Sequence, residues 1–174
     1  MDALRYPIGP FVAPAEVSPE DRARYIQQIA DVPSSLRLAV DALKPDQLEE
    51  PYRPGGWTAR QVVHHLADSH LNSYLRFRLA LTEEEPTIKT YYEDRWAELP
   101  DSRNAPTEIS VSLLESLHRR WVLMLTALRE EEWKRSFRHP ELGVLRLDHN
   151  LALYAWHGRH HVGHIRSIAE RASG

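Results

Sequence analysis

Apolar residues recur every three to four positions in four long stretches of the chain, which is the spacing of helices with one buried face. The expected helices cover residues 19–43, 58–82, 107–131 and 148–172. Pro33 should divide the first of them into two helices, because a proline inside a helix removes a backbone hydrogen bond. Residues 1–15 contain three prolines, at positions 7, 10 and 14, and are expected to form an extended arm.

The helix starts carry capping signals. Ser18-Pro19 suits the start of the first helix, Thr58 and Gln61 form a capping box, and Thr107 or Ser110 is expected to cap the third helix. Residues 83–106 are too long for a plain loop and should cross over between the second and third helices, with a short helix at 93–99. Residues 137–147 favour a small hairpin before the last helix. The pattern predicts an all-α four-helix bundle, with residues 1–174 as a single domain.

The expected helix 58–82 has two apolar faces, so we expect burial on both sides. One face contains Val62, Leu66 and Phe77, whereas the other contains leucines at positions 71, 75 and 79. A polar line runs between the faces and consists of His65, Ser69, Asn72 and Arg76. A polar line between two apolar faces must be hydrogen-bonded internally or must line a wet cleft.

Composition narrows the function classes. A net charge of −3 provides no basic field for nucleic acid, which is therefore not an expected partner. No stretch reaches the roughly 18 consecutive apolar residues that a membrane span requires, and no export signal is evident, so we expect a cytoplasmic protein. The chain has no cysteine, so nitrogen and oxygen atoms must bind any metal ion.

Four of the ten histidines lie within residues 156–164. In a helix this places His157 and His161 on one side, and His160 and His164 in a second pair, because successive residues turn by about 100°. The apolar stripe of the same helix borders the first pair, which we therefore expect to face inward. If His65 faces this pair, three imidazoles would converge in the manner of a catalytic metal site.

The remaining histidines have simpler explanations. His64 and Asp68 fit a surface pair one helical turn apart. His70 falls on the apolar face of its helix and is expected to be a hydrogen-bonded core residue. The isolated residues His118, His139 and His149 are expected at the surface or in capping positions.

Several strings together resemble a known family. They are Pro51-Tyr52-Arg53, Gly55-Gly56-Trp57-Thr58, Arg60 to His70, and Trp156-His157 followed by His160-His161. The chain resembles the DinB-like superfamily, and in particular its YfiT/BstA branch of bacillithiol S-transferases, along nearly its whole length. The resemblance implies a four-helix bundle, commonly a homodimer, with one divalent ion, zinc or nickel, bound by His65, His157 and His161. Many members have a glutamine where this chain has His164.

The resemblance also implies an activity. A metal-dependent S-transferase would add a low-molecular-weight thiol to small electrophiles for detoxification, with bacillithiol, glutathione, mycothiol and coenzyme A all open as the thiol. Asn72 and Arg76 are candidates for substrate contact, and Arg76 or Arg159 could pair with thiol carboxylates. Two alternatives are a metal-dependent hydrolase that uses a metal-bound water, and a non-catalytic metal-binding stress protein.

Overall fold

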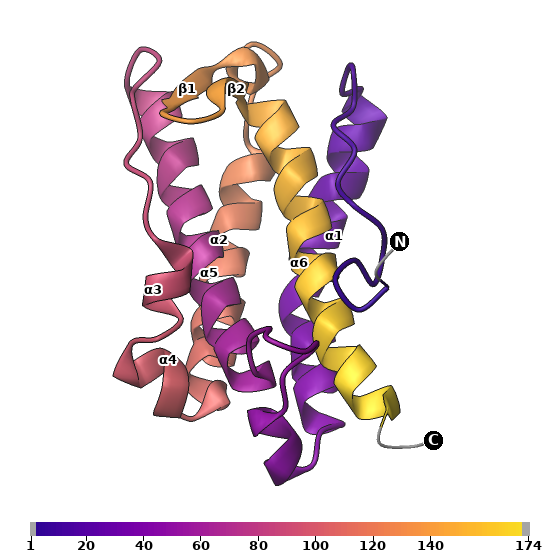
Figure 1. Ribbon diagram of the computed structural model, residues 1–174. Coiled ribbons are helices and arrows are strands. Elements are labelled where there is room, and N and C mark those ends of the chain that lie inside the picture. Colours follow the sequence, from indigo (N-terminus) through magenta and orange to yellow (C-terminus); the bar gives the residue numbers. More distant parts are fainter. Residues whose placement is uncertain (1–2, 172–174) are drawn as a thin grey trace.

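The computed structural model describes residues 3–171 (Figure 1). Four long helices form a bundle: α1 (Pro19–Asp41), α2 (Ala59–Thr82), α5 (Thr107–Thr126) and α6 (Leu147–Arg171). The shorter elements are η1 (Pro45–Glu49), α3 (Glu93–Trp96), α4 (Pro100–Asn104), η2 (Glu132–Lys134), β1 (Ser136–His139) and β2 (Gly143–Arg146). The predicted four-helix bundle, its long crossover and its hairpin are confirmed. The expected arm and last helix also included residues 1–2 and 172, which lie outside the described residues.

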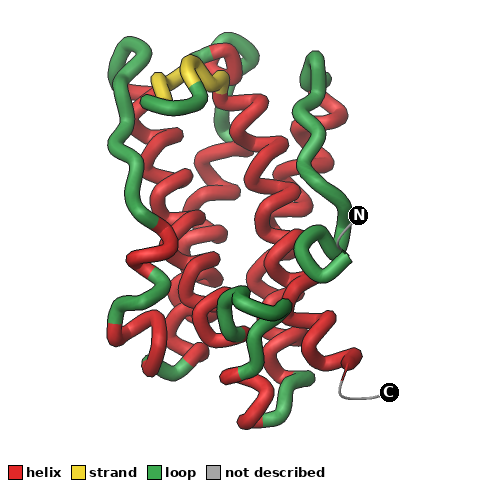
Figure 2. The backbone as a smooth tube through the Cα atoms, in the orientation of Figure 1, coloured by secondary structure: helices red, strands yellow, loops and turns green. Residues whose placement is uncertain are grey.

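Each long helix packs mainly against two others, and two of the neighbouring pairs run parallel. The bundle order is α1, α6, α2 and α5, with α5 closing back onto α1. Helices α1 and α6 run in one direction and α2 and α5 in the other (Figure 1). Parallel neighbours cannot be joined by a tight turn. Residues 83–106, which connect α2 to α5, therefore run back along the length of the bundle. This path brings α3 beside the middle of α2. The antiparallel hairpin β1–β2 lies at one end of the bundle (Figure 2).

The capping predictions were right for two helices and wrong for one. The Ser18 hydroxyl accepts from the Asp21 amide at the start of α1, and Thr58 and Gln61 form the expected reciprocal pair at the start of α2. Helix α5 begins after Pro106, with no capping hydrogen bond from a side chain. It also ends at Thr126 instead of near residue 131, because the chain leaves the helix after Thr126 and then enters η2.

Pro33 does not divide α1, contrary to the prediction. The helix continues through this buried proline, which cannot donate to the carbonyl of Ile29 four residues earlier. A ring nitrogen of His118, on α5, lies 2.7 Å from that carbonyl oxygen. A histidine from a neighbouring helix therefore provides the hydrogen bond that the proline removes.

The bundle interior has two apolar clusters separated by a layer of histidines. One cluster, around Phe77, Trp121 and Leu151, lies toward the hairpin, and the other, around Leu66 and Ile165, lies toward the opposite end. The expected burial of both α2 faces is wrong, because Leu71, Leu75 and Leu79 are 37%, 48% and 36% exposed. Among the described residues, no helix is long and apolar enough to cross a membrane.

Candidate metal centre

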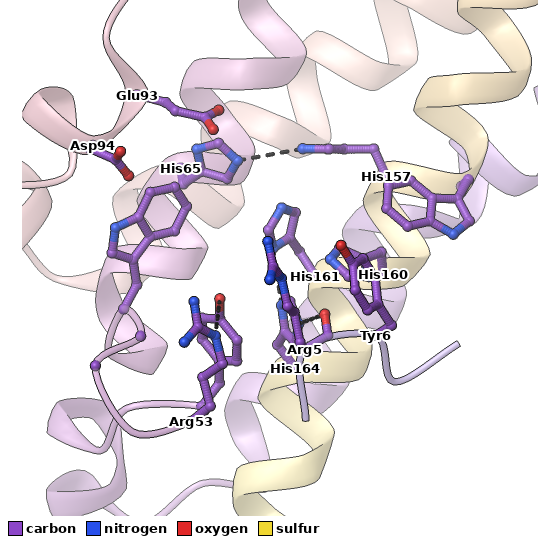
Figure 3. Close-up of a pocket in the computed structure, with 15 residues that line it drawn as sticks. Arg5, Tyr6, Arg53, His65, Glu93, Asp94, His157, His160, His161 and His164 are labelled. Carbon is purple, nitrogen blue, oxygen red and sulfur yellow. Dashed lines mark hydrogen bonds between the residues drawn. The ribbon is translucent and has the colours of Figure 1, made fainter. Parts of the chain in front are cut away.

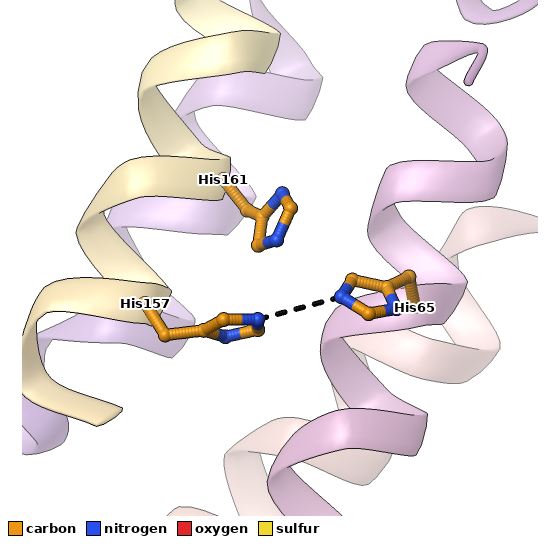
Figure 4. Close-up of side chains that lie close together, drawn as sticks. All are labelled: His65, His157 and His161. Carbon is orange, nitrogen blue, oxygen red and sulfur yellow. Dashed lines mark hydrogen bonds between the residues drawn. The ribbon is translucent and has the colours of Figure 1, made fainter. Parts of the chain in front are cut away.

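Three histidines from two antiparallel helices converge in the histidine layer. His65 projects from α2, and His157 and His161 project from successive turns of α6 (Figure 4). One ring nitrogen of each lies within 4.8 Å of those of the other two, and the Nε2 atoms of His65 and His157 are 3.4 Å apart. The structure thus brings together the three residues that the helical faces and the resemblance had indicated.

The chemistry of this cluster suits a divalent transition-metal ion. Burial lowers the pKa of His65 to about 3, and burial also lowers the pKa values of His157 and His161 well below the ordinary value. All three imidazoles are therefore neutral near pH 7 and have a free lone pair, which is the form that binds metal. Imidazole ligands without thiolate suit zinc, nickel, copper and iron ions.

A cavity of about 440 Å³ opens onto the three histidines (Figure 3). Arg5 and Tyr6 of the N-terminal arm line one wall. Tyr52, Arg53 and Trp57 line another, and they come from the turn before α2, which Gly55 allows with a φ of +70°. Glu93 and Asp94 of α3 lie on the side of His65, opposite the two arginines (Figure 3).

A second cavity of about 720 Å³ adjoins the first. The two cavities share Glu93, Asp94 and His157, so both border the candidate metal centre. The lining of the second cavity contains three cations, Arg76, Lys89 and Arg95, and three carboxylates, Glu93, Asp94 and Glu141.

The residues predicted to contact substrate lie in different places. Arg76 lines the second cavity, and its contact with substrate stays a prediction. Asn72 lines neither cavity and donates to the carbonyl of Asp68 in its own helix. Arg159 borders a different hollow, between α1 and α6, so the prediction that it pairs with a thiol at the three histidines is wrong.

Two other histidines, His64 and His118, are more buried than predicted. His64 is 6% exposed and contacts Ser110 and the Ala105 carbonyl, so the expected surface pair with Asp68 is wrong. His118 is 1% exposed and is not a surface residue. His70 is a core residue, as expected. His139 accepts from the amides of Glu141 and Leu142 in the hairpin turn, and His149 contacts Asp148.

The second histidine pair of α6 also lines the first cavity. His160 stacks on Trp156 and His164 stacks on Tyr52, with ring centroids 4.3 Å and 3.9 Å apart. His160, His161 and His164 could geometrically form another metal cluster. That cluster shares His161 with the first, and His164 already contacts His161 and the Arg5 carbonyl through its two nitrogens. We therefore assign the candidate centre to His65, His157 and His161.

The acidic side of the site was not predicted from the sequence. Glu93 and Asp94 line both cavities, whereas no candidate site residue predicted from the sequence is acidic. The consecutive acidic residues after Tyr91-Tyr92 were visible in the crossover, but helical periodicity cannot show where a crossover lies. The aromatic and basic residues of the arm and of the 52–57 turn were missed for the same reason.

Comparison with known proteins identifies relatives along nearly the whole chain. The family model of the DinB superfamily matches residues 28–165. Proteins of Bacillus cereus and Bacillus thuringiensis, both named "Putative metal-dependent hydrolase", are 53% identical over 171 residues, which cover 98% of each chain. The solved structure of YfiT from Bacillus subtilis is described as "a probable metal-dependent hydrolase with an unusual four-helix bundle topology". It is similar with a TM-score of 0.95 and 46% identity, over 98% of both chains. The chain therefore belongs to the DinB superfamily.

Proposed function

We propose that this protein is a metal-dependent enzyme that transfers a low-molecular-weight thiol to a small electrophile. The observation that carries the proposal is the pair of cavities that meet at His157, one of the three histidines of the candidate centre. A reaction between two organic substrates requires two binding spaces that share one reacting point, and the two cavities share His157, Glu93 and Asp94.

His65, His157 and His161 would bind the ion, for which zinc or nickel is the proposed identity. When bound, the ion would supply an electrophilic position that lowers the pKa of a thiol or of a water molecule entering it. The chain has no cysteine that could compete for the electrophile or the ion.

The cationic side chains of the second cavity suit a thiol that has carboxylate groups, as bacillithiol and glutathione do. Arg76, Lys89 and Arg95 line this cavity, and within residues 3–171 none of the three forms an ion pair. Unpaired cations in a concave site attract and orient anionic ligands. The smaller cavity, with its aromatic walls, would accept the electrophile.

The proposed reaction is a substitution at carbon. The thiolate sulfur forms a bond to the electrophilic carbon, and the bond to a leaving group such as a halide breaks as that group takes the bonding electron pair. The thiol proton passes to a base, for which Glu93 is the proposed acceptor because it lines both cavities. Burial and the neighbouring Asp94 raise the pKa of Glu93, which moves this carboxylate toward the range of a general base.

Hydrolysis is the second candidate, and two observations favour it. The names of the relatives point to it, and Glu93 and Asp94 provide the carboxylate that activation of water requires.

One assay separates these functions. Protein loaded with zinc or nickel is mixed with a fluorogenic alkyl halide and with bacillithiol, glutathione or no thiol, and His157→Ala serves as the control. Thiol-dependent acceleration that the variant lacks would support the transferase. Metal-bound protein without such acceleration, but with turnover of an ester or amide probe, would favour hydrolysis. Metal binding with neither activity would refute both and leave a binding role.

A further inference from the structure

A row of histidines extends from the candidate metal centre into the core. The Nδ1 atom of His157 lies 3.1 Å from Nε2 of His70, and Nδ1 of His70 lies 2.9 Å from Nε2 of His118. The row ends where Nδ1 of His118 lies 2.7 Å from the carbonyl oxygen of Ile29. His70 and His118 are 0% and 1% exposed, so water does not replace these contacts.

The carbonyl at the end fixes the direction of every hydrogen bond in the row. A carbonyl oxygen only accepts, so His118 must donate through Nδ1, and a neutral imidazole then has its lone pair on Nε2. His70 must therefore donate through Nδ1 to His118, and by the same reasoning His157 donates through Nδ1 to His70. The lone pair of His157 consequently lies on Nε2, the atom that points toward His65 (Figure 4).

Pro33 leaves the accepting carbonyl without a partner from its own helix. In an uninterrupted helix the amide of residue 33 would donate to the Ile29 carbonyl, but proline has no amide hydrogen. This carbonyl is therefore available to His118.

A second, shorter row of histidines orients His161, the other candidate metal ligand on α6. Nε2 of His164 lies 3.1 Å from the carbonyl oxygen of Arg5, so this nitrogen donates and Nδ1 of His164 has the lone pair. Nδ1 of His161 lies 3.3 Å from that atom and must donate to it. His161, like His157, then presents the lone pair of its Nε2 atom.

We propose that His70, His118 and His164 are positioning residues that fix His157 and His161 as tautomers with a proton on Nδ1, so that both present Nε2 to the metal ion. Partners behind metal ligands generally set the tautomer and the ring orientation in this way. The proposal rests on the metal binding of the proposed function and is independent of the reaction.

The wild-type protein provides the first test. A long-range ¹H–¹⁵N correlation spectrum of the metal-free protein, with labelled histidines, identifies the protonated nitrogen of each ring. We expect Nδ1 to be protonated in His70, His118, His157 and His161, and Nε2 in His164. A proton on Nε2 of His157 in the metal-free protein would overturn the inference.

Two matched variants provide the second test. Glutamine at position 118 keeps the polarity of the row, because its amide can donate to the Ile29 carbonyl while its oxygen accepts from His70. Leucine at the same position provides neither group. His118→Leu should weaken zinc binding by roughly 10–100-fold in competition with a chromophoric chelator, and His118→Gln should bind close to wild type. Circular dichroism checks that both variants fold.

The outcomes separate the inference from the metal site itself. If His157→Ala still binds zinc like the wild type, the metal site is wrong. If His157→Ala loses zinc but His118→Leu keeps full affinity, only the positioning role is wrong. Should His118→Leu fail to fold, the pair His164→Leu and His164→Gln makes the same comparison in the outer row.

Discussion

Replacing Gly158 by alanine should destabilise the bundle, although alanine is the better helix former. Gly158 lies in the middle of α6 and faces Val32 of α1. A Cβ atom at this position would lie 2.5 Å from Cγ2 and 3.2 Å from Cγ1 of Val32, and 3.3 Å from Cε1 of His70. Val32 is 2% exposed and its branched side chain has few alternative rotamers, so the clash forces the two helices apart.

The two opposing effects can be compared in size. The higher helix propensity of alanine favours the variant by roughly 0.5–1 kcal/mol. Overpacking a filled core typically costs about 1–3 kcal/mol. The expected net loss is about 1 kcal/mol, which corresponds to a Tm lower by roughly 2–4 °C for a domain of this size.

Thermal unfolding of four proteins tests this reasoning: wild type, Gly158→Ala, Val32→Ala and the double variant. With Val32 shortened, the same glycine change should become neutral or stabilising, because the clashing methyl groups are gone. Gly163→Ala is the control, because a Cβ atom at this position would lie 2.9 Å from Cγ of Pro7, which belongs to the N-terminal arm and lies outside the bundle core. A Gly158→Ala protein with an unchanged or higher Tm would refute the close approach of α1 and α6.

Three further predictions concern acid, substrate and metal. The metal-free protein should lose stability as the pH falls below 6.5, because His65 and His118 have folded pKa values of about 3 and about 4 and are protonated first in the unfolded chain. Each should contribute a loss of about 2 kcal/mol at pH 5 in urea unfolding, and equal stability at pH 8 and pH 5 would contradict this. Arg76→Gln should raise the KM for a carboxylate-bearing thiol by about tenfold with little change in kcat. The KM for an uncharged thiol should not change. Equal effects on the KM values of both thiols would argue against an ionic contact. Zinc at 100 times its Kd should stabilise the wild type by about 2.7 kcal/mol in thermal unfolding, and His161→Ala should lose this gain; a variant that keeps it would remove His161 from the metal site.

The sequence sufficed for features that depend on local periodicity. The helices, two of their caps and the inward direction of His157 and His161 follow from helical spacing within a single element. The two apolar faces of α2 were misjudged, because a pattern shows which residues are apolar but not how many neighbours cover them. Pro33 was misjudged because its helix is completed by His118, which comes from another helix 85 positions later in the chain.

The acidic residues at the site could not be predicted for a related reason. Their position depends on the path of a 24-residue connection, from 83 to 106, between two parallel helices. Hydrophobic periodicity is informative within helices, and it gives no direction for the segments between them. The parts of the site built from α2 and α6 were therefore predicted, whereas the walls contributed by the arm, the 52–57 turn and α3 were not.

Through the contact between His164 and the Arg5 carbonyl, docking of the N-terminal arm would be coupled to ion binding at the candidate metal centre. Any free energy by which arm docking favours ion binding must appear equally as a gain in arm docking when the ion binds. Trp156, which donates to the Gly9 carbonyl, and Pro7, which packs on Gly163, belong to the same docking surface. Occupancy of a buried site would thereby be visible at the surface, as slower proteolysis or slower amide exchange of the arm.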